Sequence, residues 1–177
     1  MIFAAGATVT VVVLAAAIVG VLRPATLPQT PPEVAIANAS VLREGVPAFV
    51  TVKELTGLAS EARRLRSTED LAPLGVPHLD ELPVFVVKRG HDVRAFIGLD
   101  PRNGCRLETT TISFASNAPG RLVFHDVCHG SIYDLAGKRI GGPSPWDLDE
   151  IVASVRGGVV RADRRAVIPG AWAADGD

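Results

Sequence analysis

Side chains that could bind a metal gather in two short segments of this 177-residue chain. The first segment runs from Asp100 to Cys105 and the second from Asp126 to His129, and together they hold the chain's two cysteines, Cys105 and Cys128. Thiolates suit soft metals and iron–sulfur clusters, whereas carboxylates favour harder ions. The two segments are therefore the first candidates for a metal-binding or structural site.

The second segment continues into a pattern typical of a known family. Residues 128–134 read Cys-His-Gly-Ser-Ile-Tyr-Asp, and a glycine- and proline-rich stretch follows at 141–145. This pattern resembles the second cluster-binding loop of Rieske iron–sulfur proteins, Cys-x-Cys-His-Gly-Ser-x-Tyr, in the branch whose two loops also share a disulfide. The resemblance places Cys128 at the disulfide position and His129 at an iron-ligand position. Asp126 stands where the family has a cluster cysteine.

The first segment can be compared with the family's other loop, Cys-x-His-x-x-Cys. Counting back from Cys105 puts Asp100 at the cluster cysteine and Arg102 at the cluster histidine. The resemblance then implies a disulfide between Cys105 and Cys128, with three of four iron ligands replaced. We expect no cofactor, because carboxylates at both thiolate positions should not hold an ordinary [2Fe–2S] cluster. The alternative is a cluster held by an unusual ligand set.

Charged side chains are expected to meet at the vacated tip of the two loops. We predict a salt-bridge cluster in which Arg102 pairs with Asp100 and Asp126. Asp100, Asp126 and His129 are also weak candidates for a mononuclear metal site. Because the Arg102 cation would repel a metal ion, we predict that none is bound.

Supporting roles follow from the resemblance for five further residues. Hydroxyl groups at two of these positions would donate hydrogen bonds toward a cluster and its ligands, and the other three shape the loop through their backbone preferences. These residues are Ser131, Tyr133, Gly142, Pro143 and Pro145.

The N-terminal segment has the composition of a membrane anchor. Residues 2–22 carry no charge and are long enough, as a helix, to cross a bilayer core. A cleaved signal peptide is the rival interpretation, but the positively charged start and a clear cleavage site are missing. We expect a single-pass anchor at 2–22, a proline-rich linker at 23–33 and a head domain at 34–177.

The two cysteines also bear on localisation. A structural disulfide persists in an oxidising compartment and not in reducing cytosol. The sequence therefore predicts a bacterial cytoplasmic membrane protein with its head on the periplasmic or extracellular side.

The head is predicted to be all-β, a Rieske-like antiparallel sandwich or barrel with a cluster-loop subdomain at about 98–146. We expect a hairpin at 85–93, a helical, charged insertion at 54–80, and a surface loop at 107–121. Trp146 is expected to cover the barrel or to contact a partner, and we favour the first. The strand-like runs are 49–52, 84–87, 93–97, 122–124 and 159–162.

Charge and motifs narrow the function. The net charge of −1 gives no indication of nucleic-acid binding, and no hydrolase elbow or phosphate loop is present. We predict a non-catalytic, Rieske-like subunit that assembles or stabilises a respiratory or photosynthetic electron-transfer complex beside cytochrome b-like or c-like membrane subunits. The alternatives are a functional [2Fe–2S] carrier in a quinol-oxidising complex and, more weakly, a small-molecule or metal-binding module at the tip.

Overall fold

The computed structural model describes residues 32–66, 79–113 and 119–173. The predicted anchor at 2–22 and nearly all of the linker at 23–33 lie outside these residues. Within the described ranges, no helix is both long and apolar enough to span a membrane.

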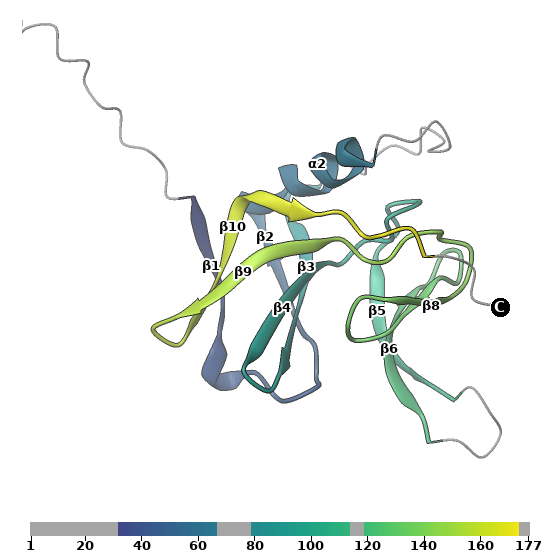
Figure 1. Ribbon diagram of the computed structural model, residues 1–177, viewed down its shortest axis with the longest axis horizontal. Coiled ribbons are helices and arrows are strands. Elements are labelled where there is room, and N and C mark those ends of the chain that lie inside the picture. The colour runs from purple at the N-terminus through teal and green to yellow at the C-terminus, as the bar shows by residue number, and fades with distance from the viewer. Residues whose placement is uncertain (1–31, 67–78, 114–118, 174–177) are drawn as a thin grey trace, which may run out of the picture. The chain divides into compact units, whose positions relative to one another are not determined.

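Six antiparallel strands form the larger sheet, which curls into a near-barrel (Figure 1). The order across the sheet is β1 (Glu33–Asn38), β10 (Val159–Ile168), β9 (Glu150–Arg156), β4 (Asp92–Ile97), β3 (Leu82–Arg89) and β2 (Ala48–Val52). β3 is buried along most of its length, as expected for a strand with packed faces on both sides. The sheet encloses the main apolar core.

Four shorter strands form a second antiparallel sheet. They are β5 (Leu107–Ile112), β6 (Arg121–Asp126), β7 (Ile132–Tyr133) and β8 (Arg139–Gly141), in that order. Aromatic rings join the two sheets, since the Phe85 ring on β3 lies 4.8 Å from the Phe124 ring on β6, centroid to centroid. Both candidate segments lie at the ends of strands in this region, because residues 100–105 lead into β5 and residues 126–131 connect β6 to β7.

The predicted all-β character of the head is confirmed, and all five predicted strand runs fall within strands. The predicted hairpin at 85–93 is also confirmed, with β3 and β4 paired from Val84 opposite Ile97 to Arg89 opposite Asp92. The surface loop predicted at 107–121 is wrong over its first part, because β5 occupies Leu107–Ile112 and pairs with β6. A run of β-branched threonines explains the strand, since such side chains fit a pleated sheet well. Residues 114–118 of that prediction lie outside the described ranges.

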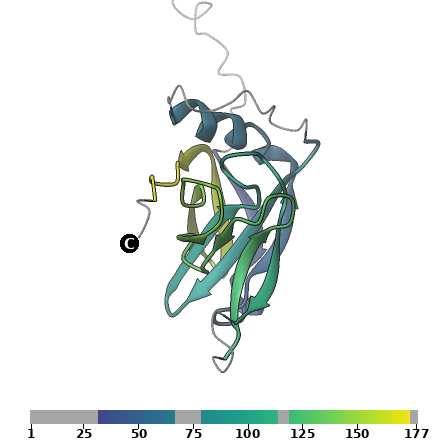
Figure 2. The same cartoon turned by 90° about the vertical axis from the view of Figure 1, so that its right-hand side faces the viewer.

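Helical structure is limited to short elements. The 3₁₀ turns η1 (Ala39–Val41) and η2 (Lys53–Leu55) precede α2 (Gly57–Leu65), which packs beside β10 through its apolar face. Figure 2 shows α2 lying across one end of the six-stranded sheet. The predicted helical stretch at 54–80 is therefore helical only in its first part, and residues 67–78 of it lie outside the described ranges.

Candidate functional site

The two candidate segments fold into loops with the same backbone hydrogen-bond pattern. In the first loop (residues 100–105) the Asp100 amide donates to the Cys105 carbonyl and the Gly104 amide donates to the Asp100 carbonyl, at 2.7 and 2.8 Å. In the second loop (residues 126–131) the Asp126 amide donates to the Ser131 carbonyl and the Gly130 amide donates to the Asp126 carbonyl, both at 2.8 Å. Both glycines have positive φ, 72° and 83°, which is why a residue without Cβ stands there.

Each loop begins with an aspartate whose carboxylate caps the loop's own amides. Asp100 Oδ1 accepts from the amides of Arg102 and Asn103, at 2.8 and 3.1 Å. Asp126 Oδ1 accepts from the Cys128 amide at 2.9 Å. Both side chains are almost completely buried. Buried carboxylates need such partners, and these are local Asx-type turns that aspartate forms readily.

The second oxygen of each aspartate reaches across the tip to another segment. Asp100 Oδ2 accepts from the Tyr133 hydroxyl at 2.6 Å, and Asp126 Oδ2 accepts from Asn103 Nδ2 at 2.9 Å. Asn103 therefore ties the first loop directly to the second. The two aspartates are structural centres of the tip, with both oxygens of each already in use.

Tyr133 is buried, and its environment favours the protonated phenol. Burial raises the pKa of Tyr133 far above its ordinary value, and the adjacent Asp100 carboxylate raises it further. The phenol therefore stays protonated and donates to Asp100 throughout the physiological range.

The pKa shift predicts how stability changes at alkaline pH. The folded protein holds the phenol proton more tightly than the unfolded chain does. The contribution of Tyr133 to the free energy of unfolding is therefore complete below pH about 10 and is lost as pH rises above that value. Above pH about 10, we expect the free energy of unfolding of the wild type to fall by up to about 1.4 kcal/mol per pH unit more than that of Tyr133→Phe. Urea unfolding at several pH values measures both slopes.

The same prediction has a direct spectroscopic check. Tyr133 is the only tyrosine in the chain, so ultraviolet difference titration follows its ionisation alone. Tyrosinate absorbance should appear only as the protein unfolds. A titration of the folded protein with a midpoint near pH 10 would contradict the buried hydrogen bond to Asp100.

The predicted Arg102 salt-bridge cluster is wrong. The Arg102 guanidinium donates to the Pro143 carbonyl at 3.0 Å, and no ion pair joins it to Asp100 or Asp126 among the described side chains. The physical reason is that loop amides, Tyr133 and Asn103 already satisfy the carboxylate oxygens. Arg102 instead joins the first loop to the proline loop (residues 141–145).

A disulfide closes the tip. Cys105 and Cys128 are bonded to each other, with Cα atoms 6.3 Å apart, as the resemblance implies. Cys128 is exposed and Cys105 is half-buried. His129 is more than half exposed, and its Nδ1 lies 3.5 Å from Asp126 Oδ2. The structure thus brings Cys105, Cys128 and Asp126 together, and His129 adjoins this group through Asp126.

The proline loop packs against the second loop. The Ser144 amide donates to Ser131 Oγ at 3.1 Å, and both serines are buried. Gly142 has a φ of 87°, and a Cβ at this position would overlap the Gly130 carbonyl. Pro143 supplies the carbonyl that Arg102 binds. These residues hold the second loop and the proline loop in place.

Pro145 and Trp146 connect the proline loop to the C-terminal part of the head. The Pro145 carbonyl accepts from the Ala173 amide at 2.8 Å. Trp146 is buried, and its ring meets that of Trp172 edge to face at 5.5 Å. Trp146 therefore covers the fold, which was the favoured expectation, and exposed Trp172 forms the outer ring of the pair.

Arg66 is a buried residue beside the first loop that the sequence did not single out. It follows α2, forms a buried ion pair with Asp149, and donates to the Pro101 carbonyl at 3.2 Å. Its guanidinium also stacks over the Trp146 ring, 5.6 Å from the centroid. Burial lowers the pKa of Arg66 to about 10, so it remains a cation at neutral pH. The end of α2 is thereby fastened to the first loop.

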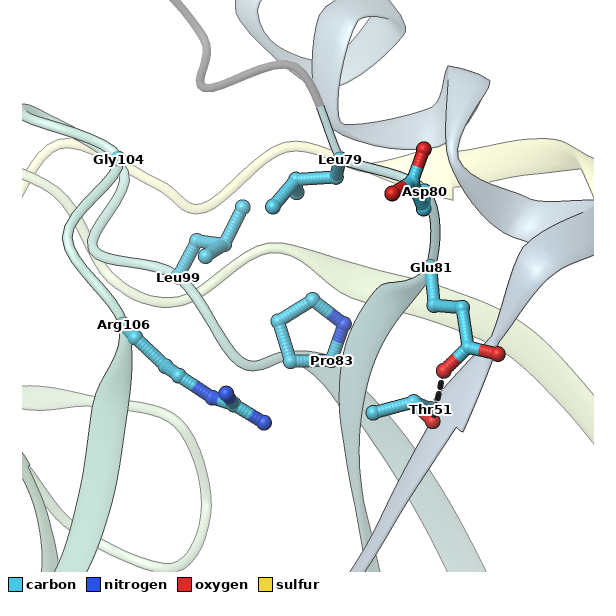
Figure 3. A pocket seen from close by; sticks show the side chains of 8 residues that line it. All are labelled: Thr51, Leu79, Asp80, Glu81, Pro83, Leu99, Gly104 and Arg106. Atoms are coloured by element: carbon cyan, nitrogen blue, oxygen red, sulfur yellow. Dashed lines mark hydrogen bonds between the residues drawn. The ribbon is translucent and has the colours of Figure 1, made fainter.

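A pocket of about 640 Å³ opens beside the first loop (Figure 3). Leu79, Leu99 and Pro83 give it an apolar middle, and Arg106 projects into it from the start of β5. At its far side Glu81 Oε2 accepts from the Thr51 hydroxyl at 2.5 Å. The pocket could admit a small amphipathic molecule, and no residue in it was predicted as functional.

The sequence did contain a signal for one of the missed residues. Asn103 Oδ1 accepts from the Cys105 amide at 2.7 Å, which is the two-residue spacing of an Asx turn. Its amide nitrogen then points to Asp126. Arg66 and Arg106 carried no comparable local signal.

Comparison with known proteins identified no relative of this chain. No protein-family model matches the chain, and no curated protein matches it either. The chemistry of the site therefore rests on its geometry: two matched loops, two buried carboxylates and one disulfide that joins them.

Proposed function

We propose that this chain is a membrane-anchored, Rieske-like subunit of an electron-transfer complex, that it lacks a [2Fe–2S] cluster, and that it acts in the assembly and stability of the complex. The head is then a non-catalytic part of an oxidoreductase assembly. Its partners would be cytochrome b-like or c-like membrane subunits, with the head on the outer side of a bacterial cytoplasmic membrane.

One observation carries this proposal. The two loops that the resemblance identifies as cluster loops face each other and are joined by a disulfide, but aspartates capped by local amides begin both loops. Such loops are rigid without a metal, since the disulfide and the bonds from Tyr133 and Asn103 link them. A rigid, closed tip suits a docking or structural element.

The donor set does not fit a Rieske cluster. That cluster requires a thiolate and an imidazole from each loop. At the corresponding positions Asp100 and Asp126 are hydrogen-bonded carboxylates, and the Arg102 guanidinium is directed to Pro143. Only His129 retains its ligand type, so we assign no electron-transfer step to this chain.

The proposed membrane attachment rests on sequence. Residues 2–22 supply the uncharged span, and residues 23–33 supply a proline-rich connection to β1. In a complex, the span would pack against neighbouring transmembrane helices. The disulfide is consistent with a head in an oxidising compartment.

Co-purification tests the proposed role. The tagged full-length chain should be recovered from detergent-solubilised native membranes together with haem-containing subunits. A strain that lacks the chain should show less assembled complex on a native gel, and restoring the gene should correct this. A variant without residues 2–22 is the matched control and should lose the partners.

Two outcomes would contradict the role. The tagged chain could migrate alone after mild solubilisation, or the complex could assemble to the same level without it. Either result would leave the head without a function in assembly.

A further inference from the structure

The disulfide shares its surroundings with two further metal-binding side chains. One donor atom each from Cys105, Cys128 and Asp126 can be chosen so that all lie within 4.8 Å of one another. His129 is not within this group of three, but its Nδ1 lies 3.5 Å from Asp126 Oδ2, so its exposed ring can supply an imidazole after rotation. We propose that reduction of the Cys105–Cys128 disulfide turns this part of the tip into a zinc site whose ligands are Cys105, Cys128, Asp126 and His129.

These side chains match the preferences of Zn²⁺. Zinc is bound tetrahedrally by thiolate, imidazole and carboxylate ligands, and a closed set of four is typical of structural sites. Two thiolates and one carboxylate supply three negative charges, which outweigh the nearby Arg102 cation. Arg102 is in any case directed to the Pro143 carbonyl.

The required movement is small. In a tetrahedral site with Zn–S bonds of about 2.3 Å, the two sulfurs are roughly 3.7 Å apart. Each sulfur must therefore move by roughly 1 Å from its position in an ordinary disulfide, which side-chain rotation can provide. The Cα atoms, 6.3 Å apart, can stay near their present positions.

Asp126 can bind the metal without losing its role in the loop. Its Oδ1 keeps the bond from the Cys128 amide, and its Oδ2 faces His129 and Asn103. Coordination through Oδ2 would replace the hydrogen bond from Asn103. His129 is more than half exposed, so its ring can rotate toward the metal.

The redox step is a thiol–disulfide exchange with a protein dithiol. A thiolate of the reductant attacks one sulfur of the disulfide, and Cys128 is the more exposed of the two residues. The second thiol of the reductant then completes its own disulfide, and two electrons and two protons pass to Cys105 and Cys128. Binding of Zn²⁺ releases the two thiol protons.

Cobalt titration tests the site, with Co²⁺ as the spectroscopic probe for Zn²⁺. The full-length protein is reduced with a dithiol, freed of reductant without oxygen, and titrated with CoCl₂. We expect one Co²⁺ per chain, with thiolate-to-cobalt charge-transfer bands and tetrahedral visible bands that disappear when ZnCl₂ is added. The oxidised protein should show neither set of bands.

Single variants distinguish this site from unspecific binding. His129→Ala and Asp126→Asn should each weaken Co²⁺ binding by at least about tenfold, because losing even a residue that only supports a ligand typically costs that much. His129→Ala changes an exposed side chain, so its folding is not at risk. His91→Ala, at the β3–β4 turn, removes another exposed imidazole and should leave binding unchanged.

Three results would overturn the proposal. These are absence of Co²⁺ binding by the reduced protein, equal binding by the oxidised protein, and unchanged binding by His129→Ala. The first two would remove the role of the cysteines, and the third would remove the imidazole from the site.

Discussion

Replacing Arg66 with methionine should lower the free energy of unfolding by about 3–5 kcal/mol. The substitution leaves the Asp149 carboxylate buried without its cation, and it also removes the bond to the Pro101 carbonyl and the stacking on Trp146. Methionine fills much of the volume of the arginine's apolar stem, so the change in the free energy of unfolding comes mainly from loss of the guanidinium group. Thermal unfolding should show a melting temperature lower by roughly 10 °C.

Two variants serve as controls for Arg66. Arg64→Ala removes an exposed arginine that pairs with Glu61 on α2, and it should leave the melting temperature nearly unchanged. The double variant R66M/D149N leaves no charge at the site of this ion pair, so it should be more stable than R66M. If the effects of R66M and D149N simply add, the ion pair does not contribute as described.

Removing the disulfide with Cys105→Ala and Cys128→Ala should lower the free energy of unfolding by about 3 kcal/mol. The two cysteines are 23 residues apart, so the bond closes a loop of moderate length and restricts the unfolded chain. Urea unfolding with and without reductant measures this contribution. Reductant should destabilise the wild type and have no effect on the double alanine variant. An identical unfolding midpoint in both conditions would show that the disulfide does not stabilise the tip.

Much of the scaffold could be predicted from local patterns. Runs such as Val84–Val87 combine apolar and β-branched residues, and the Gly90 turn separates β3 from β4 as hairpin chemistry requires. The cysteine positions likewise agreed with the resemblance. Each of these patterns lies within a short segment of the chain, so it can be recognised in a single sequence.

The parts that could not be predicted depend on long-range packing. Arg102 was expected to neutralise the aspartates. Instead, backbone amides of the first loop donate hydrogen bonds to the Asp100 carboxylate, and the Arg102 guanidinium binds elsewhere. Arg66 belongs to the charged stretch predicted at 54–80, and no sequence feature separated it from the other charges there. Its burial depends on Asp149 and Trp146, which approach only when the chain folds, and no sequence periodicity marks that contact.

Iron and labile-sulfide analysis with low-temperature electron paramagnetic resonance tests the central claim most directly. The subunit is purified from native membranes without oxygen and measured after dithionite reduction. We predict a folded protein with an intact disulfide before reduction, less than stoichiometric iron and sulfide, and no Rieske-type signal. Two irons and two sulfides per chain with a rhombic Rieske-type signal would contradict the account and establish an electron carrier with an unusual ligand set.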